Sequence, residues 1–415
     1  MKKTISKPGR TVSSNVKRPI PVAGLKIGMY VAELDRPWLE TPFLLQGFRI
    51  ESLEDIDTLA GYCDYVYVEE PEQQWLKGEQ RTLLEQPTAR KIYPQNALNK
   101  QSFAVAGATH KNARQLTRSF MDDVRLGRGI NIQEVKTTVS ECVKSIMHNP
   151  DALLWMGKIR QKDEYTAEHS LNVGFLAMTF GRHLGASEEE LNVLGLCGIL
   201  HDVGKMKTPL EVLNKEGRLT AEEFQIMKSH PVDGRDILLN HKDVHHSAVD
   251  VCYSHHEALD GSGYPRGLQS SNISEITRIV TICDVYDAIT SERVYKTGQS
   301  SLEALKVLYQ NRETKFDNRL VTEFIECIGL YPPGSIVELK NGEVGIVIST
   351  NYRHRHLPKA LLVRDSNKMP TKETVVNLEK KAGSENNLYV INTVLANGSH
   401  GIRIEKYIKR GLTIE

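Results

Sequence analysis

The feature that most constrains the fold of this 415-residue chain is a long stretch, from about residue 113 to 330, with a helical pattern almost throughout. Apolar residues recur there at three- and four-residue spacing, which is typical of helices with one buried face. Ser187 with Glu190, and Thr220 with Glu223, have the capping-box spacing that marks helix starts. The stretch therefore predicts an all-α domain with a substantial buried core.

The pattern changes on both sides of this stretch, so we expect a multidomain protein. Strand-like segments and a short helix starting near Ser52 predict a small α/β domain before it. After it, β-prone runs flank Asn341-Gly342, which is a strong hairpin signal and predicts a β-rich extension. The expected segments are a basic flexible tail (1–18), the α/β domain (19–78), a linker and helical lead-in (79–132), the all-α domain (133–331) and the β-rich C-terminal module (332–415).

Composition argues against nucleic-acid binding, a disulfide or zinc-ribbon framework, and a membrane span. Fifty-three Lys and Arg residues balance 52 Asp and Glu residues, for a net charge of +1, so we expect no binding to a nucleic-acid polymer. Six cysteines without a C-x-x-C pair indicate neither a disulfide framework nor a zinc ribbon. No apolar run approaches the ~20 residues that span a bilayer. We therefore predict a cytoplasmic protein without a membrane association.

Metal-type ligands are concentrated in the all-α stretch. A lone His on a helix is usually an ordinary polar side chain, and Asp284 and Asp287 taken alone are typical of a solvated helix face. The coincidence of His-Asp-x-Gly-Lys, His-His-Glu and a later helical Asp in one domain favours a metal site instead. Mixed imidazole and carboxylate ligands suit Fe or Mn. The candidate ligands are His169, His201, Asp202, His230, His255, His256 and Asp284.

Two motifs carry a resemblance to a known family. His201-Asp202-Val203-Gly204-Lys205, followed by His255-His256-Glu257-Ala258-Leu259-Asp260-Gly261-Ser262-Gly263-Tyr264-Pro265, closely resembles the HD-GYP subgroup of HD-domain phosphohydrolases. The resemblance extends from about 135 to 330. It implies an all-α HD-type catalytic domain and hydrolysis of the bacterial messenger cyclic di-GMP. Residues 19–78 also resemble a small N-terminal domain that is often fused to HD-GYP modules.

The resemblance also implies roles for individual residues. One divalent metal would be held by His169, His201, Asp202 and Asp284, and a second by His230, His255 and His256, with Asp202 bridging. A hydroxide between the two metals would attack the phosphodiester. Lys205 would stabilise the pentacoordinate phosphorus or assist the leaving oxygen.

Substrate contacts are expected in two places. Gly263, Tyr264 and Pro265 form a glycine-rich loop in which Tyr264 can offer its ring or hydroxyl to a base or phosphate; in isolation such a loop is a plain tight turn. Arg293 and Lys296 match family positions that contact substrate phosphates, although an Arg-Lys pair is otherwise usually a solvated face.

The sequence departs from the family at one position, and it leaves several functions open. Some members use a glutamate four residues before the first histidine for a third metal; Tyr165 stands there, so we predict two metals per chain. The leading function is hydrolysis of cyclic di-GMP to pGpG, with further hydrolysis to GMP left open. The alternatives are a 3′,3′-cyclic GMP-AMP phosphodiesterase, or a non-catalytic module that binds a dinucleotide or a diguanylate cyclase (GGDEF) protein. A homodimer is left open.

Overall fold

The computed structural model describes residues 17–35, 41, 48–50, 52–69, 100–158, 165–291, 298–351, 354, 356–381 and 388–410. The chain divides into two compact units, Met1–Gln80 and Arg81–Glu415. Each unit is described by itself. The predicted basic tail lies outside the described residues up to residue 16, as does the predicted linker up to residue 99.

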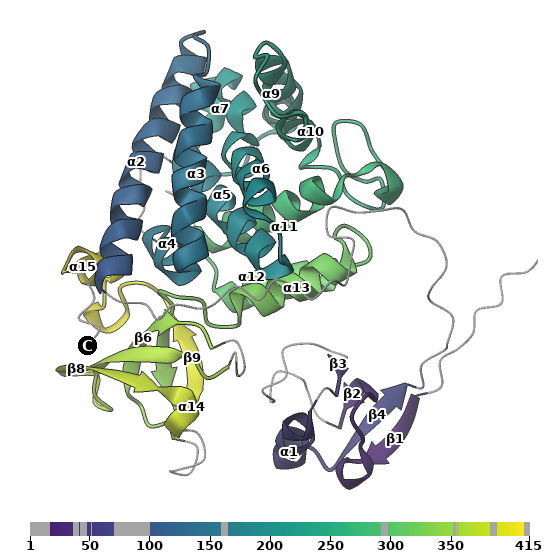
Figure 1. The fold of residues 1–415 in the computed structure, drawn as a ribbon, viewed down its shortest axis with the longest axis vertical. Coiled ribbons are helices and arrows are strands. Elements are labelled where there is room, and N and C mark those ends of the chain that lie inside the picture. Colours follow the sequence, from purple (N-terminus) through teal and green to yellow (C-terminus); the bar gives the residue numbers. More distant parts are fainter. Residues whose placement is uncertain are drawn as a thin grey trace, which may run out of the picture. The chain divides into compact units, whose positions relative to one another are not determined.

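The N-terminal unit contains a four-stranded antiparallel sheet in the order β1-β4-β2-β3 (Figure 1). Helix α1 begins after Ser52, whose hydroxyl accepts from the Asp55 backbone while the Asp55 carboxylate accepts from the Ser52 backbone. This capping box fixes the helix start expected from the sequence. Val31, Ile50 and Val66 are fully buried in the core of the unit. The elements are β1 (Lys17–Pro21), β2 (Tyr30–Leu34), β3 (Phe48–Arg49), α1 (Leu53–Tyr62) and β4 (Tyr65–Glu69).

The second unit is built mainly of helices, which confirms the all-α expectation for its central part. Both predicted capping boxes are present, at the starts of α6 and α8. Helix α5 lies at the centre, where it packs against α2, α6, α11 and α13. The helices are α2 (Lys100–Arg125), α3 (Ile132–His148), α4 (Pro150–Met156), α5 (Tyr165–Leu184), α6 (Glu188–Leu200), the 3-10 helix η3 (Val203–Lys207), α7 (Leu210–Leu213), α8 (Ala221–Met227), α9 (His230–Leu239), α10 (His246–Ser254), α11 (Glu275–Thr290), α12 (Ser301–Gln310) and α13 (Asn318–Ile328).

Helix α2 begins earlier than the sequence pattern indicated. The helical pattern was expected from about 113, whereas α2 starts at Lys100. Phe103, Ala106 and His110 are buried on this first part of the helix. The segment is rich in polar residues and its buried stripe includes small and polar side chains, so the apolar periodicity that identifies a helix is weak there.

The C-terminal part forms a five-stranded antiparallel sheet in the order β8-β7-β6-β5-β9. The predicted hairpin is confirmed, because β5 and β6 pair on either side of Asn341-Gly342. The sheet contacts α4: the Trp155 indole N–H donates to the Ile348 carbonyl at 3.1 Å. The elements are β5 (Ile336–Leu339), β6 (Val344–Ser349), β7 (Lys359–Arg364), β8 (Pro370–Asn377), α14 (Leu378–Lys381), β9 (Ile391–Leu395) and α15 (Ile404–Arg410).

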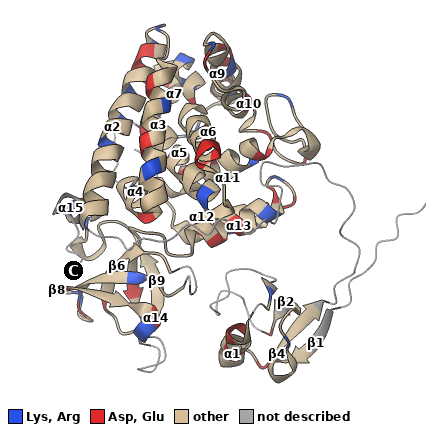
Figure 2. Ribbon diagram, in the orientation of Figure 1, with Lys and Arg blue, Asp and Glu red and all other residues tan. Residues whose placement is uncertain are grey.

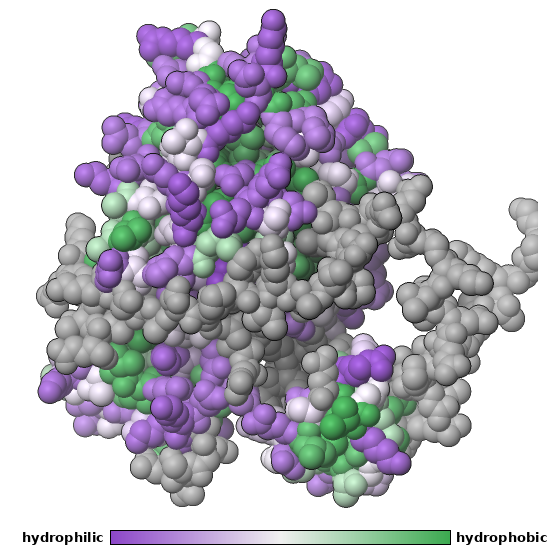
Figure 3. Space-filling view, in the orientation of Figure 1, coloured by the Kyte–Doolittle hydropathy of each residue, from purple (hydrophilic) through white to green (hydrophobic). Residues whose placement is uncertain are grey.

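The surface carries both signs of charge, as the near-zero net charge predicts. Lys, Arg, Asp and Glu residues are interspersed on α2 and α3 in Figure 2. In Figure 3 the visible face of the helical region is largely hydrophilic, with smaller apolar patches. Within the described residues, no helix is long and apolar enough to cross a membrane.

Candidate active site

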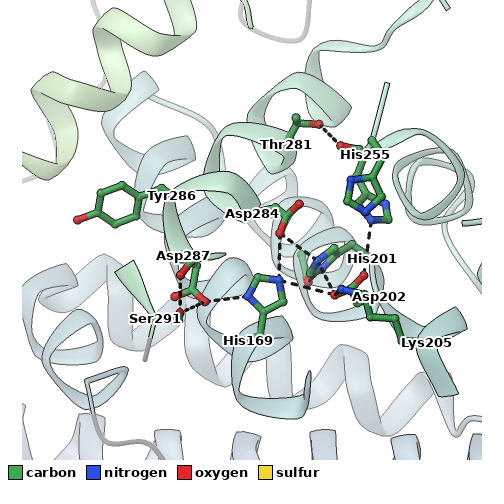
Figure 4. Close-up of polar contacts among 12 residues, drawn as sticks. His169, His201, Asp202, Lys205, His255, Thr281, Asp284, Tyr286, Asp287 and Ser291 are labelled. Carbon is green, nitrogen blue, oxygen red and sulfur yellow. Dashed lines mark hydrogen bonds and ion pairs between the residues drawn. The ribbon is translucent and has the colours of Figure 1, made fainter. Parts of the chain in front are cut away.

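The candidate site forms where several helices begin or end. His201 is the C-cap of α6, and Asp202 is the N-cap of η3, which carries Lys205. His169 lies in the first turns of α5, and His230 is the first residue of α9. Three further candidate ligands come from two other helices. His255 and His256 follow the last turn of α10, and Asp284 lies on α11 (Figure 4).

A backbone contact at Gly204 brings two of these elements together. A Cβ atom at Gly204 would lie 1.9 Å from the His230 carbonyl oxygen and 2.5 Å from the Gly234 nitrogen. Only glycine permits this approach of η3 to the start of α9. As a result, Asp202 Oδ1 lies 3.4 Å from His230 Nε2.

All seven predicted ligand residues converge in the structure. Their side-chain atoms form three groups in which every atom lies within 4.8 Å of the others. Asp202 belongs to two of these groups. The groups are Asp202, His230, His255 and His256; His169, His201 and Asp202; and His201, His255 and Asp284.

The two oxygens of Asp202 face different histidines. Oδ2 lies 3.4 Å from His201 Nε2 and 3.6 Å from His169 Nε2. Oδ1 lies 3.4 Å from His230 Nε2 and 3.5 Å from His255 Nε2. Asp202 is fully buried. A carboxylate placed between two sets of imidazoles can bridge two cations.

The backbone fixes the orientation of three imidazoles. The Nδ1 atoms of His201 and His230 each lie 2.7 Å from a backbone carbonyl oxygen, and Nδ1 of His255 lies 3.0 Å from the Cys252 carbonyl. A carbonyl can only accept, so Nδ1 carries the proton and donates, and a neutral ring then has a lone pair on Nε2. Nε2 of His230 and Nε2 of His255 are 3.2 Å apart. When both rings are neutral, two acceptor nitrogens this close repel each other, and a shared cation would relieve that repulsion.

Unpartnered polar atoms support the same conclusion. Among the described residues, His201 Nε2 and Asp202 Oδ1 are buried without a hydrogen-bond partner. A buried polar atom without a partner is costly, and a bound cation would remove that cost. The donor set of imidazole nitrogens and carboxylate oxygens suits a transition metal. The residues present therefore fit divalent metal ions.

Protonation states follow from burial and from neighbouring charges. Burial lowers the pKa of His230 to about 3 and that of His256 well below its ordinary value, so both are neutral. Burial would raise the pKa of Asp202, but Lys205 and His201 outweigh it and hold that pKa well below its ordinary value. These are the protonation states that metal binding requires.

His169 differs, because carboxylates face both of its ring nitrogens. Nε2 lies 3.0 Å from Asp284 Oδ1, and Nδ1 lies 2.8 Å from Asp287 Oδ2. Burial would lower the pKa of His169, but these hydrogen bonds outweigh it and raise the pKa to about 10. Without a cation the ring is therefore an imidazolium, and Nε2 must release its proton when a metal binds.

Lys205 supplies a fixed positive charge. Its Nζ lies 2.5 Å from Asp202 Oδ2. Burial would lower the pKa of Lys205, but Asp202 and Asp284 outweigh it and raise that pKa. The ammonium therefore stays charged and can attract a phosphate as a point charge.

The loop with Gly263, Tyr264 and Pro265 packs closely against the two histidines before it. A Cβ atom at Gly263 would lie 2.5 Å from the His256 carbonyl oxygen, so the close approach requires glycine. The Tyr264 ring stacks on the His256 ring, with centroids 4.7 Å apart. Lys228 Nζ lies 4.8 Å from the Tyr264 centroid. One ring face of Tyr264 is thus covered by His256, and the contact of its ring or hydroxyl with a substrate stays a prediction.

Sequence reasoning missed two residues that hold the site together. The buried Glu257 carboxylate accepts from the backbone N–H of Arg266 at 2.7 Å and of Leu268 at 2.8 Å, which fixes the loop. Asp287 is 3% exposed and contacts His169, so it is not part of a solvated face. The sequence did offer a signal for Glu257, because it directly follows the paired histidines. Asp287 offered none, because its partner is distant in sequence.

The sequence analysis also singled out Tyr165 and the pair Arg293 and Lys296. Tyr165 stacks on His169 with ring centroids 5.8 Å apart and an angle of 4° between the ring planes. Arg293 and Lys296 lie outside the described residues.

Two known protein families together match most of the chain. The HD domain family matches residues 154–320, and a domain of unknown function (DUF3391) matches residues 17–135. The cyclic di-GMP phosphodiesterase PA4108 of Pseudomonas aeruginosa is 33% identical over 368 residues, which cover 86% of this chain and 88% of the relative.

Two further relatives match a smaller part of the chain. The cyclic di-GMP phosphodiesterase response regulator RpfG of Xanthomonas campestris is 38% identical over 165 residues, covering 39% of this chain and 43% of the relative. The 3′3′-cGAMP-specific phosphodiesterase 1 of Vibrio cholerae is 38% identical over 160 residues, covering 38% of this chain and 36% of the relative. With its paired histidines, its His-Asp motif and its GYP loop gathered in one site, the chain belongs to the HD-GYP family of cyclic-dinucleotide phosphodiesterases.

Proposed function

We propose that this protein is a metal-dependent phosphodiesterase that hydrolyses cyclic di-GMP to linear pGpG. The observation that carries the proposal is the position of Asp202, whose two oxygens face two different pairs of buried imidazoles. The extended similarity to a cyclic di-GMP phosphodiesterase, over 86% of this chain, supports this substrate.

Two divalent ions, Fe or Mn, are the proposed cofactors. When bound, such ions polarise phosphoryl oxygens and lower the pKa of water, so that a nucleophile is available at neutral pH. The proposed ligands of the first are His169, His201, Asp202 and Asp284, and those of the second are Asp202, His230, His255 and His256.

The protein's own charged groups favour a phosphodiester substrate. Hydrolysis adds water across one phosphodiester bond, and negative charge builds on the phosphoryl oxygens in the transition state. In this proposal Lys205, whose ammonium contacts Asp202, stabilises that charge. Arg293, Lys296 and the Gly263-Tyr264-Pro265 loop stay predictions as substrate contacts.

We also propose two metals rather than three. Tyr165 stands at the position where some relatives have a glutamate, and a neutral phenol is a poor replacement for a carboxylate at pH 7. Elemental analysis of anaerobically purified protein tests this proposal. A reproducible three equivalents per chain would contradict it.

Purified protein incubated with Mn²⁺ or Fe²⁺ and each cyclic dinucleotide, followed by separation of the products, tests the function. We expect pGpG from cyclic di-GMP. Faster turnover of 3′,3′-cyclic GMP-AMP, the substrate named for a relative, would support the alternative substrate. Binding without turnover in any metal would favour a non-catalytic module.

Asp202→Ala tests the two-metal mechanism. We expect it to lose more than nine-tenths of wild-type kcat while its circular dichroism is unchanged. Asp243→Asn, at an exposed position on the same domain, is the matched control and should retain full activity. A folded Asp202→Ala variant above one-tenth of wild-type kcat would refute a bridging role. Cytoplasmic location, diguanylate cyclase (GGDEF) partners and a homodimer stay predictions.

A further inference from the structure

The metal-facing ring of His169 is held from both sides by one helix. Asp284 and Asp287 are three residues apart on α11, so their side chains lie on the same face. Asp284 faces Nε2 at 3.0 Å, and Asp287 faces Nδ1 at 2.8 Å (Figure 4). His169 itself is 2% exposed. The ring therefore has a fixed position, although it belongs to a different helix, α5.

Asp287 is itself fixed. The Ser291 hydroxyl lies within hydrogen-bond distance of two Asp287 oxygens, Oδ2 at 2.9 Å and the backbone carbonyl, and the Ser291 backbone N–H donates to that carbonyl at 2.9 Å. Ser291 is the C-cap of α11, and it is buried. The oxygen that accepts from His169 thus has the Ser291 hydroxyl as a second donor within reach, and this neighbour restricts the rotation of the carboxylate.

The partner of Nδ1 distinguishes His169 from three other histidines of the site. In His201, His230 and His255, this nitrogen donates to a backbone carbonyl. In His169 it donates to a carboxylate, which carries a full negative charge. A carboxylate in this position fixes the tautomer of the ring, and it makes the opposite nitrogen a stronger electron donor to a metal.

Asp287 does not belong to any of the groups that could hold a metal within the described residues. Its carboxylate lies at the nitrogen of His169 opposite the one that faces Asp202 and Asp284. We propose that Asp287, held by Ser291, is a positioning residue that orients His169 and strengthens its bond to the first metal. The inference rests on the proposed metal-dependent function.

The test measures metal affinity directly, with Mn²⁺ as the probe. Free Mn²⁺ is followed by electron paramagnetic resonance during titration of the metal-free protein, and the stoichiometry and dissociation constants are compared among variants. Asp287→Ala should weaken one of two Mn²⁺ sites about 10- to 100-fold. The site with His230, His255 and His256 should be retained within about threefold.

Two milder variants keep the test valid if Asp287→Ala does not fold. Asp287→Asn retains an oxygen that can accept from Nδ1 but loses the charge, so its loss of affinity should be smaller. Ser291→Ala should weaken the same site several-fold. Thr290→Val is the matched control, because the Thr290 hydroxyl donates only within its own helix, to the Tyr286 and Asp287 carbonyls, among the contacts described.

The outcomes separate this inference from the proposed function. If the wild type binds no Mn²⁺, the proposed function fails. If the wild type binds Mn²⁺ and all three variants match it at both sites, only the role of Asp287 is overturned. Equal weakening of both sites, together with a lower melting temperature of the metal-free protein, would show a general structural role and would also overturn the proposal.

Discussion

Replacing Gly204 with Ala adds one methyl group where two elements of the site touch. The new Cβ would lie 1.9 Å from the His230 carbonyl oxygen, whereas such contacts are essentially never shorter than 3.0 Å, so η3 and α9 must separate by about 1.1 Å. Asp202 and His230, now 3.4 Å apart, lie on opposite sides of this contact. Metal–ligand distances tolerate only about 0.2 Å. Asp202 could then no longer share a metal with His230.

A displacement of about 1 Å in a catalytic site costs on the order of 100-fold in rate. We therefore expect Gly204→Ala to lower kcat about 100-fold and the metal content by one equivalent. Overpacking should also cost about 1–3 kcal/mol of stability. Turnover of cyclic di-GMP, elemental analysis and urea unfolding measure the three effects.

Gly107→Ala is the matched control for this substitution. Gly107 lies inside α2, and the nearest atoms to a new Cβ there are 3.9 Å away, on Met156. The same chemical change should leave kcat unchanged and should stabilise the helix by about 0.5–1 kcal/mol. If Gly204→Ala keeps more than half of the wild-type kcat and its full metal content, the contact with α9 does not control the site.

Three further predictions concern the buried carboxylates of Glu168, Glu257 and Asp151. Arg114→Ala should destabilise the fold by about 3 kcal/mol in urea unfolding, because it removes the guanidinium that lies 2.9 Å from the buried Glu168 carboxylate. Arg118→Ala, in an exposed pair, should cost less than about 1 kcal/mol, and equal losses from the two variants would contradict the reasoning. Glu257→Gln places an N–H against one of two backbone donors, so it should cost about 1–3 kcal/mol and speed proteolysis within 258–268; an unchanged cleavage rate would show that Glu257 does not fix the loop. Burial raises the pKa of Asp151 from 3.8 to about 6, so the folded state binds its proton more tightly, and stability is lost as pH rises from about 4 through 6, by about 3 kcal/mol at most. Asp151→Asn should therefore flatten the melting temperature between pH 4 and 7, and an unaltered pH profile would refute this origin.

Several features of this protein are determined by short stretches of its sequence. The capping boxes at Ser187 and Thr220 mark the starts of two helices, and Asn341-Gly342 marks a hairpin. Each of these signals depends on only a few consecutive residues. The family resemblance named the ligand set, and its residues converge in the structure. The start of α2 was missed, since Phe103 is the one large apolar side chain among the buried residues of its first turns.

Only the tertiary structure decided which side chains support the site. Taken alone, Asp287 is typical of a solvated helix face. In the structure it contacts His169, which lies 118 residues earlier in the chain. Helical periodicity specifies which residues share a face, but the identity of the opposing helix depends on how α5 and α11 pack. The ring of Tyr264 is likewise directed by its stacking on His256. Ligand identity is therefore encoded locally, whereas ligand orientation depends on contacts that form only when distant helices pack together.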